Sequence, residues 1–177
     1  MFSTLFARYH ATIFRYLARR VGPQLAEELA ADVFVTAFGT RARYDLTRPD
    51  AAPWLYGIAH NLLRGHQRTE RRKLRAYARH GVDPLMDEAS DAAFVAAERR
   101  LDADRSGAAV ALALASLRAE ERDVLLLVVW AGLSGEAVAE ALAVPAGTVR
   151  SRLHRAKRRM RDSLEHNGLL ATDRKEG

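Results

Sequence analysis

Residues 133–164 constrain the fold more than any other stretch, because a short apolar segment, a turn and a longer amphipathic segment follow one another. Ser134 suits a helix N-cap, since its side-chain oxygen can accept a hydrogen bond from an unpaired backbone N–H. Pro145 disfavours helix at the residue before it but suits the first turn of a new helix. We therefore expect one helix to end around residues 143–145 and a second to follow at once.

The second of these helices is predicted to have one apolar face and one strongly basic face. Its apolar residues recur at intervals of three and four, which is the helical period. They are Val149, Leu153, Ala156, Met160 and Leu164. Residues 150–161 hold seven Lys or Arg and no acid. A short bracing helix followed by a basic one is typical of a DNA-binding helix-turn-helix. The alternatives are a solvated basic helix, or one that binds a membrane surface or a calmodulin-like partner.

Charge along the chain alternates in blocks. The formal net charge is +6, which favours an anionic partner. Residues 64–79 hold seven Lys or Arg and one acid, residues 83–104 hold seven acids, and residues 150–161 are basic again. Two basic blocks separated by an acidic one indicate two nucleic-acid contacts joined by a segment that avoids nucleic acid.

The fold class follows from composition and periodicity. Alanine is abundant and favours helix, and alternating β-branched residues are absent, so we expect an all-α fold. We expect two small helical domains, over residues 1–80 and 106–165, with the helix-turn-helix in the second. An acidic linker over 81–105 joins them, and a polar tail over 166–177 ends the chain.

The periodicity also sets approximate helix limits. The first domain is predicted to hold helices over residues 2–20 and 24–39, a loop over 40–53 and a third helix from about Pro53. The second domain is predicted to begin with an Ala-rich helix to Leu117, followed by an apolar helix that Gly132 ends and then by the helix-turn-helix.

The cellular setting is limited by what the chain lacks. There is no cysteine, which excludes disulfides and thiolate metal sites. No apolar run reaches transmembrane length. Arg8 and Arg15 interrupt the apolar pattern at the N-terminus, which is unlike a signal peptide. We expect a cytoplasmic protein without membrane insertion.

The aromatic and acidic residues of the first domain could either have a structural role or bind a partner. Tyr44, Trp54 and Tyr56 could stack on unpaired bases. We expect Trp54 to be a core residue and Tyr56 to be the base contact. The acids of the second helix, Glu27, Glu28 and Asp32, lie off its apolar face and from the residues alone read as a solvated surface.

Catalytic motifs are absent from the sequence. There is no glycine-rich phosphate loop, no paired-histidine zinc motif and no nucleophile elbow. His60 and His66 lack ligand spacing on one helix face. We therefore expect no enzyme activity, no cofactor and no metal.

Three stretches carry a family resemblance. Residues 26–38 read AEELAADVFVTAF, residues 54–68 read WLYGIAHNLLRGHQR and residues 132–157 read GLSGEAVAEALAVPAGTVRSRLHRAK. In this order and spacing they resemble the extracytoplasmic-function (ECF) group of bacterial sigma factors, in which a linker joins a region 2 domain to a region 4 domain. The chain departs from the pattern at Ala143, where the family has glycine, and at Pro145, where it has serine.

The resemblance implies a role for each part. Region 2 would dock on the clamp of RNA polymerase through Glu27, Glu28, Asp32 and Phe34, which replaces the solvated-surface reading. The loop over 46–53 and the helix after it would capture a promoter −10 base and open the duplex. The implied −10 contacts are Tyr56, Asn61, Arg64, Arg68, Arg71 and Arg72. The aspartate usual after the Asn61 segment is replaced around Gly65.

The implied −35 readers are Thr148, Arg150, Ser151, Arg152, His154 and Arg155. Arg150 or Arg152 could pair with a guanine edge, since arginine is the usual bidentate donor to guanine. Arg158, Arg159 and Arg161 are expected to contact phosphate or solvent.

The resemblance implies core RNA polymerase and promoter DNA as partners, commonly with an anti-sigma factor that holds the protein inactive. Two alternatives remain from the residues. One is a helix-turn-helix regulator that acts without polymerase, and the other is a nucleic-acid-processing enzyme whose catalytic residues are unrecognised.

Overall fold

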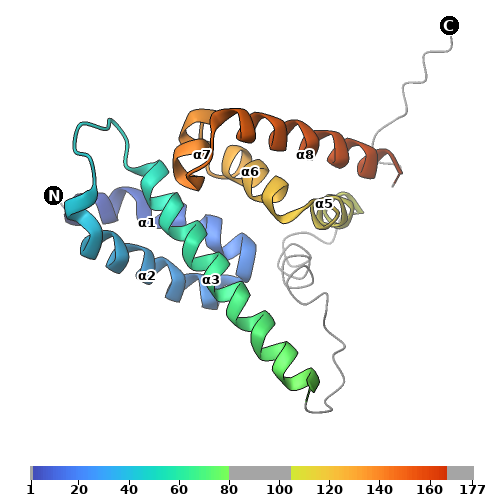
Figure 1. Cartoon of the computed structure of the whole chain (residues 1–177), viewed down its shortest axis with the longest axis horizontal. Helices are drawn as coiled ribbons and strands as arrows, with labels where there is room; N and C mark the ends of the chain where they lie inside the picture. Colours follow the sequence, from blue (N-terminus) through green and yellow to red (C-terminus); the bar gives the residue numbers. More distant parts are fainter. Residues whose placement is uncertain (1, 80–104, 167–177) are drawn as a thin grey trace, which may run out of the picture.

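A computed structural model describes residues 2–79 and 105–166 of the chain. These residues fold entirely as helices and connecting turns, as the periodicity predicted (Figure 1). In chain order the elements are α1 (Phe2–Val21), α2 (Pro23–Thr40), the single 3-10 turn η1 (Arg41–Arg43), α3 (Ala52–Arg79), α5 (Arg105–Ala115), α6 (Ala119–Val129), α7 (Gly135–Leu142) and α8 (Ala146–His166). The predicted acidic linker and most of the polar tail lie outside the described residues.

The N-terminal half, α1–α3, is built on a tight turn between its first two helices. Gly22 adopts a φ of 81°, a left-handed conformation that favours glycine, and its N–H donates to Ala18 O at 2.9 Å. Pro23 then occupies the first turn of α2, where its missing N–H costs nothing. The chain therefore reverses within one residue, and α2 packs along α1.

Apolar stripes of α1, α2 and α3 form the core of this half. Its largest fully buried side chains are Ile13, Tyr16, Leu17, Val33, Leu55 and Leu63. Tyr16 meets Tyr56 edge to face, with ring centroids 5.3 Å apart. Tyr56 is 3% exposed, whereas Trp54 is only half-buried and lies against Tyr44. Trp54 packs against the core as a half-buried residue, whereas the burial of Tyr56 corrects the expectation that it is the exposed base contact.

The C-terminal half, α5–α8, packs α8 across α5 and α6 (Figure 1). Its buried apolar residues include Leu126, Leu127, Val138, Val149 and Ala156. The guanidinium of Arg122, 8% exposed, closes the end of α5. It donates to the carbonyl oxygens of Leu114, Ala115 and Leu117 at 2.8–3.0 Å. Leu114 and Ala115 lie in the last turn of α5, where carbonyl oxygens lack an intrahelical partner, so Arg122 caps this end and joins α5 to α6.

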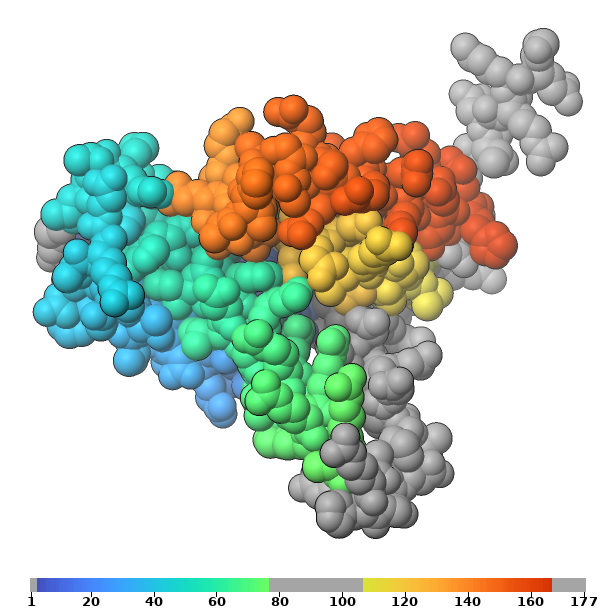
Figure 2. Space-filling view, in the orientation of Figure 1, coloured from blue at the N-terminus to red at the C-terminus, as the bar shows by residue number. Residues whose placement is uncertain are grey.

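The two halves are in direct contact, and their buried residues form one continuous cluster. The main contact is between α3 and α7, and Figure 2 shows the surface of α7 meeting α3 and the loop before it. At Gly57 the helices approach so closely that a Cβ would lie 2.7 Å from the carbonyl oxygen of Ala141. The sequence predicted two domains, but it did not predict this contact between them.

Candidate nucleic-acid interface

The predicted helix-turn-helix is formed by α7 and α8. Ser134 is the N-cap of α7 and its Oγ accepts a hydrogen bond from the N–H of Ala137 at 3.1 Å, as predicted. Ala143 follows α7 with a φ of 52°, a left-handed position in which glycine is preferred. The N–H of Val144 returns to the carbonyl oxygen of Ala139 at 3.0 Å. The turn that the family makes with glycine is therefore made here with alanine.

The apolar stripe of α8 faces the rest of the half, which leaves the basic side in solvent. Val149 and Ala156 are buried, and Leu153, Met160 and Leu164 are half-buried. Of the six predicted −35 readers, four are exposed and two are half-buried. The exposed ones are Arg150, Ser151, His154 and Arg155, and the half-buried ones are Thr148 and Arg152. The fold thus brings all six to the N-terminal part of one helix.

Glu121 of α6 orients the basic side of α8, which the sequence did not predict. Its carboxylate is 3% exposed and pairs with Arg155 at 3.3 Å and with Arg159 at 3.5 Å. Glu121 also accepts a hydrogen bond from the backbone N–H of Arg118 at 3.4 Å, which closes the N-terminus of α6. Arg155 and Arg159 are one helical turn apart, so a single buried carboxylate fixes both guanidinium groups.

The second predicted basic surface lies along α3. Asn61, Arg68, Arg71 and Arg72 are exposed on this helix. Arg64 differs, because its guanidinium reaches the carboxylates of two residues in α6. It lies 3.1 Å from Asp123 and 3.8 Å from Glu120. Arg64, which is predicted to hold phosphate, is therefore occupied by acids of the other half.

The loop before α3 is held by two aspartates. Asp45 accepts hydrogen bonds from the N–H and the hydroxyl of Thr47 at 3.0 and 2.7 Å. Asp50 accepts one from the N–H of Ala52 at 3.0 Å and one from the hydroxyl of Tyr9 at 2.5 Å. Burial alone would raise the pKa of Asp50, but the two hydrogen bonds outweigh burial and lower the pKa. The loop is therefore tied to α1 as well as to α3.

The predicted polymerase-docking face of α2 is only partly as expected. Glu27, Glu28 and Asp32 are exposed on α2, as the periodicity predicted. Phe34 is 4% exposed and packs edge to face on Phe6, with ring centroids 4.9 Å apart, so it does not contribute to this surface. The reason is helical phase, since Phe34 follows buried Ala30 by one turn. The apolar residues that are exposed on α2 are Val35 and Phe38.

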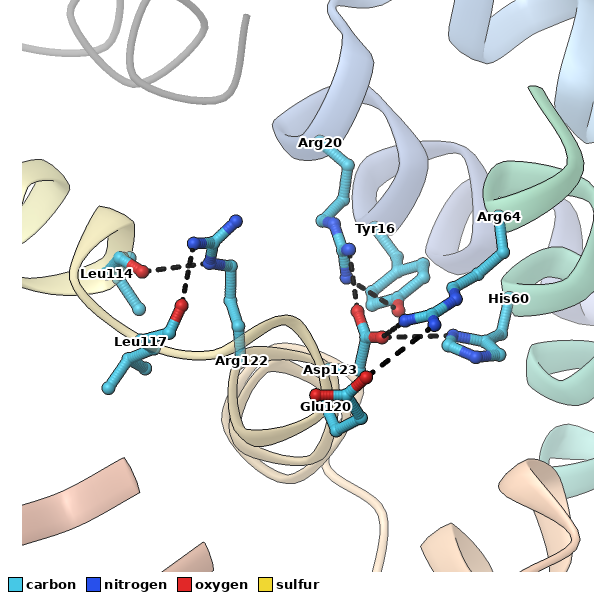
Figure 3. A network of polar contacts seen from close by, with 9 residues as sticks. All are labelled: Tyr16, Arg20, His60, Arg64, Leu114, Leu117, Glu120, Arg122 and Asp123. Carbon is cyan, nitrogen blue, oxygen red and sulfur yellow. Dashed lines mark hydrogen bonds and ion pairs between the residues drawn. The ribbon is translucent and has the colours of Figure 1, made fainter. Parts of the chain in front are cut away.

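A polar cluster centred on Asp123 joins the two halves (Figure 3). Asp123 is 3% exposed, and its Oδ1 lies 2.7 Å from Arg20 of α1. Its Oδ2 lies 3.1 Å from Arg64 and 3.8 Å from Nδ1 of His60, both on α3. Arg20 also donates to the hydroxyl of Tyr16 at 3.3 Å.

Burial raises the pKa of Tyr16 to about 12, so its hydroxyl stays protonated within this cluster. Burial would raise the pKa of Asp123 as well, but the charges of Arg20 and His60 outweigh burial and keep that pKa low. Asp123 is therefore an anion held by cations of the other half.

Residues 2–79 and 105–166 contain neither a candidate metal site nor a membrane-spanning helix. No group of three His, Cys, Asp or Glu side chains in these ranges could hold a metal ion. None of the helices described there is long and apolar enough to cross a bilayer.

A helical chain with an exposed basic helix in a helix-turn-helix, and a second basic helix beside it, is a two-part DNA-binding protein. Comparison with known proteins refines this class. The family model described as sigma-70 region 2 matches residues 5–73, and the one described as sigma-70, region 4 matches residues 108–160.

Curated relatives match over nearly the whole chain. The ECF RNA polymerase sigma factor SigK of Mycolicibacterium vanbaalenii is 30% identical over 161 residues, which cover 89% of this chain and 76% of the relative. The ECF RNA polymerase sigma factor SigL of Mycobacterium tuberculosis is 28% identical over 166 residues, which cover 93% of this chain and 89% of the relative. The chain belongs to the ECF RNA polymerase sigma factors, which direct transcription initiation.

Two solved structures share the fold. The sigma factor RpoE in complex with the anti-sigma factor NepR from Bartonella quintana superposes with a TM-score of 0.68 at 20% identity, over 93% of this chain and 96% of that one. CnrH in complex with the cytosolic domain of CnrY superposes with a TM-score of 0.62 at 24% identity, over 93% of this chain and 88% of that one. The regulator that acts without polymerase is not favoured by these matches.

Proposed function

We propose that region 4 of this sigma factor reads the promoter −35 element with the N-terminal half of α8. The observation that supports this is the exposed group formed by Arg150, Ser151 and His154, on a helix whose opposite face is buried at Val149 and Ala156. A major groove admits one α-helix, and the first turns of a recognition helix reach the base edges. Arg158 and Arg161 lie further along and supply charge to the phosphates.

Region 2 captures the −10 element with α3 and the loop before it. A base taken out of the stack needs a pocket and a hydrogen-bonding partner, while cations hold the flanking backbone. Asn61 is an exposed amide on α3, and Arg68, Arg71 and Arg72 are exposed cations about two to three turns further on. Tyr56 does not belong to this group, because its side chain is buried.

The exposed acids of α2 dock on core RNA polymerase. Glu27, Glu28 and Asp32 form the charged part of this surface, and Val35, 71% exposed, supplies an apolar contact. Charged residues around an apolar contact raise the association rate of the two proteins and fix their relative orientation.

The protein acts in the cytoplasm as a regulator without chemistry of its own, and an anti-sigma factor is its expected inhibitor. Support for the inhibitor comes from the two similar structures, which are sigma factors bound to an anti-sigma factor or to the cytosolic domain of a second protein.

Run-off transcription with purified core polymerase tests the function. The factor is added to core enzyme and genomic promoter fragments, and the transcript start sites are mapped. We expect initiation at a defined set of sites that share two sequence elements. Binding of promoter fragments without initiation would instead support a regulator that acts without polymerase. Cleavage or modification of DNA in the absence of polymerase would support an enzyme.

A further inference from the structure

A cavity lined mostly by arginine lies between α3, the end of α1 and the turn from α5 into α6. Its volume is about 260 Å³, and five arginines and one carboxylate line it. The arginines are Arg20, Arg64, Arg71, Arg118 and Arg122, and the carboxylate belongs to Asp123. Figure 3 shows three of the five arginines, Arg20, Arg64 and Arg122, grouped beside α6. A cavity with this lining favours an anionic ligand.

The acids of the described residues do not balance these cations. The carboxylate of Asp123 is shared between Arg20 at 2.7 Å and Arg64 at 3.1 Å. Arg64 has a second acid, Glu120, at 3.8 Å. Within residues 2–79 and 105–166, two carboxylates therefore pair with a group of five guanidinium ions. An excess of one charge in a cavity with low-dielectric walls concentrates the electrostatic potential and attracts the opposite charge.

Two of the five arginines are available to a ligand. Arg71 of α3 and Arg118, which precedes α6, are exposed. Neither pairs with a carboxylate in the two described ranges. Gln67, one turn before Arg71 on α3, also lines the cavity, and its amide is a further hydrogen-bond donor. The available donors therefore come from both halves of the chain.

The buried arginines contribute charge rather than direct contacts. Arg20 is held by Asp123, and Arg122 donates to three backbone carbonyl oxygens at 2.8–3.0 Å. A guanidinium that donates to neutral carbonyl oxygens keeps its full positive charge, because arginine is not deprotonated in proteins. These fixed charges strengthen the attraction of an anion that Arg71 and Arg118 hold directly.

The size and the donor geometry of the cavity limit the ligand. Pockets that take drug-sized ligands have volumes of about 300–1,000 Å³, so this cavity fits a smaller group. Each guanidinium can bind one phosphate with two parallel hydrogen bonds. Two guanidinium groups that reach the cavity from different halves therefore match two linked phosphates.

We propose that this cavity is a binding site for a small anion with a diphosphate group, held directly by Arg71, Arg118 and Gln67. Free pyrophosphate and a nucleoside diphosphate share this chemistry. Because the donors come from α3 and from the start of α6, a bound ligand connects the two regions of the sigma factor. Binding at this site does not depend on the proposed function, since it involves neither polymerase nor promoter DNA.

Isothermal titration calorimetry of the full chain with sodium pyrophosphate, at fixed ionic strength, tests the site. We expect pyrophosphate to bind about tenfold more tightly than sulfate, because its second anionic group gains further charge-assisted hydrogen bonds. Arg118→Ala and Arg71→Ala should each weaken pyrophosphate binding about tenfold. Arg72→Ala is the matched control, since Arg72 is exposed beside Arg71 and does not line the cavity. It should leave the affinity nearly unchanged.

Titration with ADP separates the two sources of the diphosphate group. Tighter binding of pyrophosphate than of ADP would identify the free ion as the ligand, and tighter binding of ADP would identify a nucleotide. Either result supports the site if Arg118→Ala weakens the binding. Helical circular dichroism verifies that each variant is folded, and Arg118→Gln replaces Arg118→Ala if the alanine variant does not fold.

Pyrophosphate that binds no more tightly than sulfate would overturn the proposal. Full pyrophosphate affinity in folded Arg118→Ala would also overturn it, because the ligand would then lie on the basic surface of α3 alone. An equal loss in Arg72→Ala and Arg71→Ala would have the same consequence, since it would indicate general attraction to a basic helix.

Discussion

Arg150 and Arg155 illustrate how neighbouring residues of one helix acquire different roles. Both are exposed and both lie in the predicted reading part of α8. Arg155 is fixed by the buried carboxylate of Glu121, whereas Arg150 lies one helical turn closer to the N-terminus of the helix. The sequence predicted both as cations of the basic face. It could not predict Glu121 as the partner of Arg155, because the phase of α6 places that glutamate among the buried residues 121–127.

Arg150→Ala is expected to lower the affinity for a −35 duplex by about 1–3 kcal/mol and to relax the preference at one base position, because a bidentate arginine reads a single guanine. Titration of a panel of duplexes, each carrying one base change, measures both effects. Arg161→Ala, an exposed cation further along α8, is the control and should weaken all duplexes alike. A loss for Arg150→Ala that is uniform across the panel would make it a phosphate contact.

At the scale of elements, α3 has a wider buried face than its sequence periodicity predicts. Its buried residues include Leu55, Tyr56, Ala59 and Leu63, which form a stripe wide enough to meet two partners. α3 packs on α1 and α2 along one side and on α7 along the other. The periodicity did not show how wide this stripe is, so it missed that Tyr56 packs on Tyr16 of α1, and nothing in the sequence marks the side that meets α7. The limits of α7 and α8 were predictable because Ser134 and Pro145 act locally, Ser134 through a side-chain cap on its own helix and Pro145 through its fixed backbone angle.

Ala143→Gly is expected to stabilise the chain by about 0.5–1 kcal/mol, because glycine adopts the left-handed conformation of this turn without the strain of a Cβ. Urea unfolding of the full chain, followed by helical circular dichroism, measures the free energy. Ala139→Gly, inside α7, is the control and should destabilise by about the same amount. Equal destabilisation by both changes would show that Ala143 is not strained.

Asp32→Arg on α2 is expected to weaken binding to core polymerase severalfold and to leave the fold intact, because the side chain is exposed and reversal of its charge opposes a basic docking surface. Competition against a labelled sigma factor measures the affinity. Gln24→Arg adds a positive charge at another exposed position of the same helix and should have a smaller effect. Unchanged affinity for Asp32→Arg would remove α2 from the docking surface.

At the scale of the molecule, the contact between the regions depends on residues far apart in the chain. Arg20 and Asp123 are 103 positions apart, and both are buried. The sequence singles out neither residue, because each has other charged residues next to it in its own helix. Only the fold pairs them, because periodicity assigns a face to each helix but does not say which faces meet. The division into two domains therefore stays a prediction, and it carried no information on how the helices of the two halves pack together.

The contact between the two halves should weaken in mild acid. Burial lowers the pKa of His60 from its ordinary value of 6.5, and the charges of Arg20 and Arg64 lower it further against the opposing effect of Asp123. The two halves in contact therefore bind this proton more weakly than separated halves, in which His60 would meet water. The stability of the contact is complete above 6.5 and falls as the pH drops below that value toward the lowered pKa.

Energy transfer between dyes on Ala31→Cys of α2 and Asp162→Cys of α8, two exposed positions in a chain without cysteine, measures this separation when it is followed from about pH 7.5 to about pH 5.5, the range in which histidine titrates. The dye distance should lengthen toward the acid end. His60→Gln should remove most of the change, and His66→Gln on the same helix is the control that should retain it. A distance that is constant over this range would exclude His60 from the control of the contact.

The pairing of Arg48 with Glu140 bears on how such a protein finds its targets in a chromosome. A chain with a net charge of +6 is attracted to any duplex, and a genome offers on the order of a million or more non-specific sites for each promoter. Acids that cover part of the basic surface reduce this indiscriminate adsorption.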